Sequence, residues 1–218
     1  GSRMADTFRQ LYRTFKDAKK EKHIFLYLIA FFFFINGVYT IIDMATAYGS
    51  ALGLDSTGLL LALLVTQIVA FPFAIIFGRL SAKYDTGLLI KVCIICYTCI
   101  TAFGMFLNFL WQFWMLAVMV GMFQGGVQAL SRSYLGKIIP AERSGEFYGL
   151  MDICGKGASF VGTTLVAFVN QIAANVEIHI GVITLKNANL AVGALIILFI
   201  IGYFIFCKAD QLNKARMQ

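Results

Sequence analysis

The chain has 218 residues, of which 60% are hydrophobic and only 13% are charged, with a net charge of +7 and a mean hydropathy of +0.80. A soluble domain usually carries about 25% charged residues. This composition therefore excludes an ordinary soluble protein and indicates a membrane protein with several spans. The positive charge lies beside the apolar segments rather than in one basic patch, which argues against a nucleic-acid-binding protein.

The N-terminal segment is polar. Residues 1–3 resemble a cloning remnant ahead of Met4 and are left out of the fold prediction. Residues 4–22 have the pattern of a basic amphipathic helix, which is typical of segments that lie on an anionic membrane surface. A solvated, partly helical linker fits the same pattern. The apolar face would carry Met4, Phe8, Leu11, Phe15 and Ala18, and the other faces Arg9, Arg13, Lys16, Lys19 and Lys20.

Six apolar stretches are long enough to cross a bilayer, which takes about 20 helical residues. Pro72 lies inside the second stretch and is expected to bend it. The predicted fold is an all-α bundle over residues 23–208, followed by a polar tail at 209–218. The spans are predicted at 24–47, 57–78, 87–109, 112–136, 146–173 and 189–207.

The lysines and arginines predict the orientation. Sixteen of the 18 fall in segments that share one side of a six-span bundle, namely the two terminal segments and the regions 79–91 and 132–143. The opposite side holds only Lys186, and Lys156 lies inside a span. Because cytoplasmic loops are enriched in basic residues, both termini are expected to be cytoplasmic, in a multi-pass protein of the plasma (inner) membrane.

Polar side chains follow one helical face in the first, fourth and fifth spans, and the second span carries Thr66 and Gln67. Such groups are costly at membrane depth and normally face a bundle interior or a wet cavity. These four spans are therefore predicted to line a cavity, and the third and sixth to support them. The candidate cavity residues are Asn36, Thr40, Asp43, Gln67, Gln124, Gln128 and Lys156.

Several of these residues have a second interpretation. The two glutamines of the fourth span fit hydrogen bonding between helices as well as a cavity role. Asp152 and Lys156 are spaced i, i+4 and fit a self-neutralising pair. Asp43 has no basic neighbour in sequence, so desolvation would raise its affinity for a proton and favour a coupling or substrate-binding role.

Cysteine and small residues indicate packing. Cys93, Cys96 and Cys99 have metal-ligand spacing, but they lie inside an apolar helix without a nearby fourth ligand, so no metal site is predicted. The pairs Gly121–Gly125 and Ala158–Gly162 have the small-xxx-small spacing of close helix contacts.

Two segments resemble the major facilitator superfamily. The turn GRLSAKYDTG, residues 78–87, resembles its loop signature at Gly78, Leu80 and Lys83, whereas Ala82 and Asp85 depart from it. Residues 31–49 and 125–162 resemble the vacuole-effluxer-like branch of that superfamily, whose members export amino acids from the vacuole. The positions that carry this resemblance are Gln128, Arg132, Pro140, Glu146, Gly149, Lys156 and Ser159.

The resemblance implies the C-terminal six-helix half of a twelve-helix secondary transporter, built as a 3+3 inverted repeat. It implies a small polar substrate, amino acids among the candidates, with proton coupling. A cytoplasmic gate or latch would contain Gly78, Arg79, Asp85, Arg132, Glu146 and Asp152. The expected partners are the lipid bilayer and either an N-terminal half or a second copy of the chain.

Other classes of protein have less support. A six-helix membrane module that forms a homodimer without transport remains the alternative to a transporter half. The sequence lacks the motifs of metalloproteases, serine hydrolases and phosphate-binding loops, so no enzymatic activity, cofactor or catalytic residue is expected.

Overall fold

The computed structural model describes residues 2–173, 178–180, 183–185 and 187–217. Within them, six long helices are apolar enough to cross a membrane, which confirms the predicted all-α bundle of six spans. A shorter helix, α1 (Ser2–Lys20), precedes them. The spans belong to α2 (Lys22–Ala51), α3 (Ser56–Lys83), α4 (Thr86–Gly104), α5 (Leu110–Ile138), α6 (Ser144–Ile172) and α7 (Asn187–Met217).

Three helix ends differ from the predicted spans by five residues or more. The second span was expected to end at residue 78, but α3 continues to Lys83. The third span was expected to reach residue 109, but α4 ends at Gly104. The sixth was expected to end at residue 207, but α7 continues to Met217, so the predicted polar tail is helical as far as that residue. Helix α3 continues through Pro72 without interruption.

The helix starts are capped by acidic side chains in two cases. Asp55 accepts a hydrogen bond from the amide of Gly58 at 2.8 Å at the start of α3. Asp85 accepts from the amides of Gly87 and Leu88, both at 3.3 Å, at the start of α4. These bonds satisfy amides that have no partner inside the helix.

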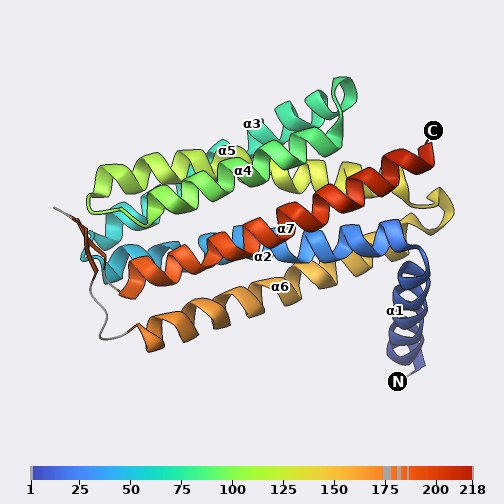
Figure 1. Ribbon diagram of the computed structural model, residues 1–218, viewed down its shortest axis with the longest axis horizontal. Coiled ribbons are helices and arrows are strands. Elements are labelled where there is room, and N and C mark those ends of the chain that lie inside the picture. The colour runs from blue at the N-terminus through green and yellow to red at the C-terminus, as the bar shows by residue number, and fades with distance from the viewer. Residues whose placement is uncertain (1, 174–177, 181–182, 186, 218) are drawn as a thin grey trace.

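The packing follows the two-fold relationship expected of an inverted repeat. In such a repeat, α2, α3 and α4 form one unit, and α5, α6 and α7 are their respective counterparts in the other. The packing of α3 against α5 then has its counterpart in the packing of α6 against α2. The contact of α4 with α5 likewise corresponds to that of α7 with α2, and all four contacts are extensive. Helices α4 and α7 also pack against each other, as Figure 1 shows for the near side of the bundle.

Small residues allow the closest helix contacts. A Cβ atom on Gly121 would lie 2.6 Å from the backbone oxygen of Thr66, and one on Gly125 would overlap the backbone oxygen of Ala70. Gly162 packs in the same way against the side chains of Asn36 and Thr40 on α2. The predicted small-residue contacts therefore join α5 to α3 and α6 to α2.

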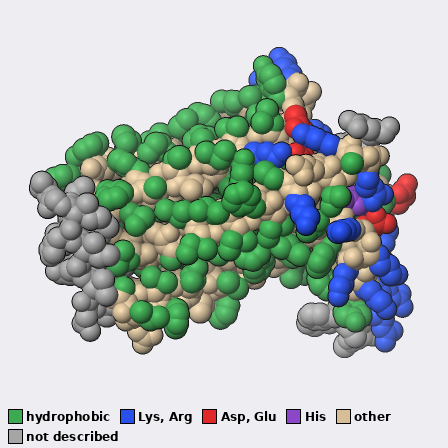
Figure 2. All heavy atoms as spheres, in the orientation of Figure 1, with side chains coloured by type: hydrophobic (Ala, Val, Ile, Leu, Met, Phe, Trp, Pro, Cys, Tyr) green, Lys and Arg blue, Asp and Glu red, His purple; other side chains and the backbone are tan. Residues whose placement is uncertain are grey.

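The outside of the bundle is apolar, and the charged side chains gather at one end (Figure 2). Helices α3 and α6 bury the smallest share of their apolar windows, 17% and 22%. Phe71 on α3 and Phe160 on α6 are among their most exposed side chains. These two helices therefore present large apolar surfaces to a bilayer or to a further protein unit.

Helix α1 lies across the charged end of the bundle, roughly perpendicular to the long helices (Figure 1). We call this end the basic end; it also carries the α3–α4 turn, the α5–α6 turn and the last turns of α7. Ala18 of the predicted apolar face is buried, whereas Phe15 is exposed and contacts the ring of Phe25. The side chains of Met4 and Phe8 lie outside the described residues.

The chain between α6 and α7 was expected to be an outward loop. The structure describes two short antiparallel strands there, β1 (Ile178–Ile180) and β2 (Ile183–Leu185). They lie at the end of the bundle opposite the basic end (Figure 1). Lys186, the one basic residue assigned to that side, lies outside the described residues.

Candidate solute pathway

A polar pocket of about 280 Å³ lies between α2, α5 and α6. Two predicted cavity residues line it, Gln128 and Lys156, together with two of the charged residues predicted for a latch, Arg132 and Asp152. Its remaining walls are formed by Phe31, Ile35, Tyr39, Met151 and Gly155. Charged groups from two helices thus converge on one pocket, which two of the seven predicted cavity residues line.

An ion pair joins α5 to α6 across this pocket. Arg132 donates to the carboxylate of Asp152 at 2.6 Å, and Tyr148 donates to the backbone oxygen of Arg132 at 3.0 Å. Both charged side chains are about half exposed, 53% and 49%. Asp152 therefore pairs with Arg132, rather than with Lys156 as the i, i+4 alternative proposed.

Lys156 has no ion-pair partner among the residues that the structure describes. It is exposed on α6, one helical turn beyond Asp152, and its ammonium group adds a positive charge to the pocket. An exposed lysine beside a neutralised Arg–Asp pair can bind the carboxylate of a small solute.

Asp43 lies further along the same side of the bundle. It is exposed on α2 and accepts a hydrogen bond from the hydroxyl of Ser159 on α6. Ser159 lies three residues after Lys156 on α6. The contact between α2 and α6, which we call the polar seam, therefore carries the ammonium group of Lys156 and, close to it, the carboxylate of Asp43.

Asn36 and Thr40 face the interior of the bundle. Thr40 donates to the side-chain oxygen of Asn36 at 3.3 Å, and both side chains are fully buried against α6. The amide nitrogen of Asn36 and the amide oxygen of Gln124 have no hydrogen-bond partner among the described residues. Buried polar atoms without a partner are uncommon and mark sites where water, a solute or a rearrangement would supply one.

Gln67 is not brought to the polar pocket. It is exposed on α3, while its neighbour Thr66 is buried and donates to the backbone oxygens of Ala62 and Ala117. The second span contributes instead to an apolar cavity of about 190 Å³ that all six long helices line, with Leu63 and Thr66 from α3.

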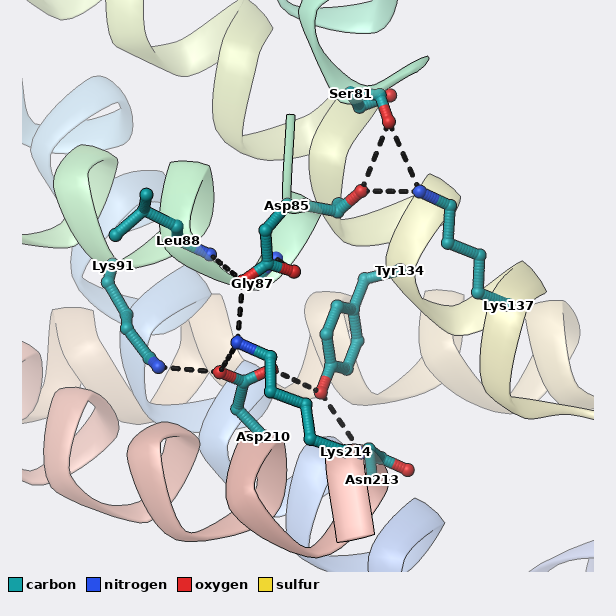
Figure 3. A network of polar contacts seen from close by, with 11 residues as sticks. Ser81, Asp85, Gly87, Leu88, Lys91, Tyr134, Lys137, Asp210, Asn213 and Lys214 are labelled. Atoms are coloured by element: carbon teal, nitrogen blue, oxygen red, sulfur yellow. Dashed lines mark hydrogen bonds and ion pairs between the residues drawn. The ribbon is translucent and has the colours of Figure 1, made fainter. Parts of the chain in front are cut away.

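Three predicted latch residues lie at or near the α3–α4 turn: Gly78 and Arg79 in the last turns of α3, and Asp85 directly before α4. Gly78 and Arg79 are exposed, and the backbone oxygen of Gly78 accepts from Ser81 at 2.9 Å. Asp85 accepts from the ammonium group of Lys214 on α7 at 2.6 Å (Figure 3). Burial raises the pKa of Asp85, but the hydrogen bond and charge of Lys214 outweigh it and hold the pKa below its ordinary value of 3.8.

Glu146, the remaining latch residue, fixes α1 to the start of α6. Its carboxylate accepts from Arg143 at 2.7 Å, from Thr14 at 2.9 Å and from Gln10 at 3.0 Å. Arg143 also pairs with Asp17 of α1 at 3.0 Å. This contact is not predicted by any local pattern, because the two segments lie more than 120 residues apart in the chain.

The bundle and its polar face define a class of polytopic helical membrane protein with a solute-sized hydrophilic pocket. Comparison with known proteins identifies the family. The family model described as "Vacuole effluxer Atg22 like" matches residues 1–211, so the chain belongs to that family.

The relatives that the chain matches are named as transporters or autophagy-related proteins. The chain is 40% identical over 206 residues to "Uncharacterized MFS-type transporter YxiO" of Bacillus subtilis, a match that covers 94% of this chain and 45% of the relative. It is 26% identical to "Autophagy-related protein 22-1" of Aspergillus fumigatus, covering 77% of this chain and 30% of that protein. The protein of the same name from Emericella nidulans is 27% identical, with 77% and 31% covered. The chain thus spans less than half the length of these curated relatives.

Proposed function

We propose that this chain forms one half of a secondary active transporter that moves a small polar solute by alternating access. The observation that carries the proposal is the polar pocket, which holds three charged side chains between α2, α5 and α6 of an otherwise apolar bundle. Ionisable side chains within membrane-spanning helices typically mark a solute or ion pathway. The match to a transporter of about twice this length supports the same conclusion.

The missing half would cover the exposed faces of α3 and α6. One six-helix bundle encloses no complete pathway, and these two helices bury the smallest share of their side chains. A second six-helix unit, either an N-terminal half or another copy of this chain, would close the pathway and rock against the first. The basic end would be cytoplasmic, because it carries nearly all of the lysines and arginines.

A solute with both a carboxylate and an amine, such as an amino acid, would be complementary in charge to Lys156 and Asp43 on the polar seam. Lys156 would bind the carboxylate, and Gln128 would donate a further hydrogen bond. Asp43 would receive either the amine or a coupled proton, with Ser159 holding its carboxylate in place. Arg132 and Asp152 would close the pathway at its cytoplasmic side.

Ligand-induced stabilisation of the purified protein tests this proposal. The mass of the protein in detergent, corrected for bound detergent, establishes whether it is a monomer or a dimer. Amino acids are then screened for their effect on the thermal unfolding midpoint. At least one amino acid should raise the unfolding midpoint of the wild type but not that of Lys156→Gln. Lys208→Gln, which removes an exposed lysine at the end of α7, is the control and should be stabilised like the wild type. A stable dimer with no stabilising solute would favour the non-transporting module. Equal stabilisation of Lys156→Gln would refute the assigned site.

A further inference from the structure

A second charged cluster lies at the basic end, on the side of α4, α5 and α7 (Figure 3). Its centre is Asp210 on α7, whose side chain is only 3% exposed. Lys91 of α4 donates to this carboxylate at 2.5 Å, and Lys214 lies 3.2 Å from it. Tyr134 of α5 donates to it at 3.2 Å. One buried carboxylate thus contacts side chains from three helices.

The cluster also includes the α3–α4 turn. Lys214 bridges Asp210 to Asp85, whose carboxylate caps the start of α4. Gly87 lies directly against the Asp210 carboxylate, and a Cβ atom at this position would overlap it. Only a glycine at position 87 allows the start of α4 to pack this closely against Asp210.

Lysine 137 of α5 adds a separate link to the same turn. It donates to the hydroxyl of Thr86 at 2.6 Å and to the backbone oxygen of Ser81 at 3.2 Å. The two carboxylates, Asp85 and Asp210, pair with Lys91 and Lys214, and of these four side chains only Asp210 is buried. Neutralising Asp210 leaves the ammonium group of Lys91, which is 21% exposed, without its ion-pair partner, and this costs more than losing an exposed pair.

The other side of the basic end, between α5 and α6, is held together by fewer and more exposed contacts. Helices α5 and α6 contact each other sparsely, and the ion pair that joins them, Arg132–Asp152, is half exposed. Several glycines of α6, among them Gly149 and Gly157, have open space where a Cβ atom would be. Contacts that restrain α6 against α5 are therefore weaker than those that restrain α4 and α7.

We infer that Asp210 is a positioning residue that fixes the α3–α4 turn and the ends of α4, α5 and α7 as one rigid unit. Motion at the basic end is then confined to the α5–α6 side, where the polar pocket lies. In this arrangement Asp85 belongs to the fixed unit and does not act as a moving latch. Arg132 and Asp152 remain at the boundary that opens.

Amide hydrogen exchange of the full chain in lipid nanodiscs tests this inference. Asp210→Asn keeps the size of the side chain and removes its charge. It should raise exchange about tenfold or more at residues 84–92 and 205–214 while leaving α2 and α6 unchanged. Asp152→Asn, the matched control, breaks the exposed pair and should leave residues 84–92 unchanged while raising exchange at the start of α6.

Two further variants keep the test decisive. If Asp210→Asn does not fold, Lys91→Gln should give the same local pattern with a smaller amplitude, because Lys214 still neutralises Asp210. In Asp210→Asn/Lys91→Gln, removal of the uncompensated ammonium group should restore part of the protection. Uniform acceleration across all six spans would overturn the inference, as would unchanged exchange at residues 84–92 in both single variants.

Discussion

Ser159 of α6 donates its hydroxyl hydrogen to the carboxylate of Asp43 on α2, which joins the two helices on the exposed side of the polar seam. Asp43 is the one acidic residue inside the α2 span. A carboxylate with a single hydroxyl donor and an exposed surface can exchange both protons and cations with water. This contact supports the proposed role of Asp43 in binding a solute or a proton.

Asp43→Asn should abolish the dependence of transport on a pH gradient. The amide keeps a hydrogen bond with Ser159 but can no longer take up and release a proton. The measurement is solute-driven proton flux in proteoliposomes that hold the complete transporter. Ser159→Ala is the control, because it removes the hydroxyl and keeps the titrating group, so coupling should persist. An Asp43→Asn protein with unchanged proton flux would remove Asp43 from the mechanism.

Gly162→Ala should destabilise the bundle by about 1–3 kcal/mol, the usual cost of adding volume to a well-packed contact. The new methyl group would overlap Asn36 and Thr40 at the crossing of α6 with α2. Gly157→Ala on the same helix is the matched control, since no atom lies within 4 Å of its added Cβ. It should be neutral or stabilising by up to about 1 kcal/mol. Thermal unfolding followed by tryptophan fluorescence compares the two, and equal losses would contradict the crossing.

The two charged clusters should differ in their effect on stability. Asp152→Asn breaks a half-exposed pair and should cost at most about 1 kcal/mol of unfolding free energy. Asp210→Asn breaks a buried pair and should cost about 3–5 kcal/mol. Unfolding in mixed detergent gives both values. A larger loss for Asp152→Asn than for Asp210→Asn would reverse the roles that the structure gives to the two sides of the basic end.

Stability should fall when the pH drops below about 4, with Asp85 contributing to the slope. The pKa of Asp85 in the folded protein lies below its ordinary value of 3.8, because Lys214 outweighs the effect of burial. Its ionised form therefore favours folding; this stability is complete above the ordinary pKa and is lost as the pH falls through the lowered one. Unfolding midpoints between pH 6 and pH 3 should decline less steeply in Asp85→Asn. Asp6→Asn, which removes an exposed carboxylate of α1, should keep the wild-type slope.

The sequence predicts the six spans, because they follow from the length and hydropathy of each apolar stretch. It does not show which side chains of a polar stripe are buried against a neighbouring helix and which are exposed. Asn36, Thr40 and Asp43 share helical spacing, but the structure buries the first two against Gly162 and leaves Asp43 exposed beside Ser159. Which side of a polar stripe faces a neighbouring helix depends on the crossing of two spans, and a single-helix pattern does not contain it.

The clusters at the basic end were missed for a related reason. Lys91 and Lys214 were counted only as indicators of orientation, and Asp210 lies 119 residues from Lys91 in the chain. Two local signals were present: an acidic residue just after the last apolar span, and a lysine four residues beyond it. Their partners on α4 become visible only when α4 and α7 are packed side by side.

The most direct test of a solute pathway between α2, α5 and α6 is the water accessibility of position 156, which lines the polar pocket. In a variant that lacks the five native cysteines, Lys156→Cys is exposed to a charged, membrane-impermeant thiosulfonate in membrane vesicles. Ile200→Cys, on the exposed apolar face of α7, is the control for a lipid-facing position. Lys156→Cys should react at least about tenfold faster, because residue 156 lines a polar pocket among charged groups. Equal, slow reaction at both positions would show that the seam is dry and would contradict a solute pathway between α2, α5 and α6.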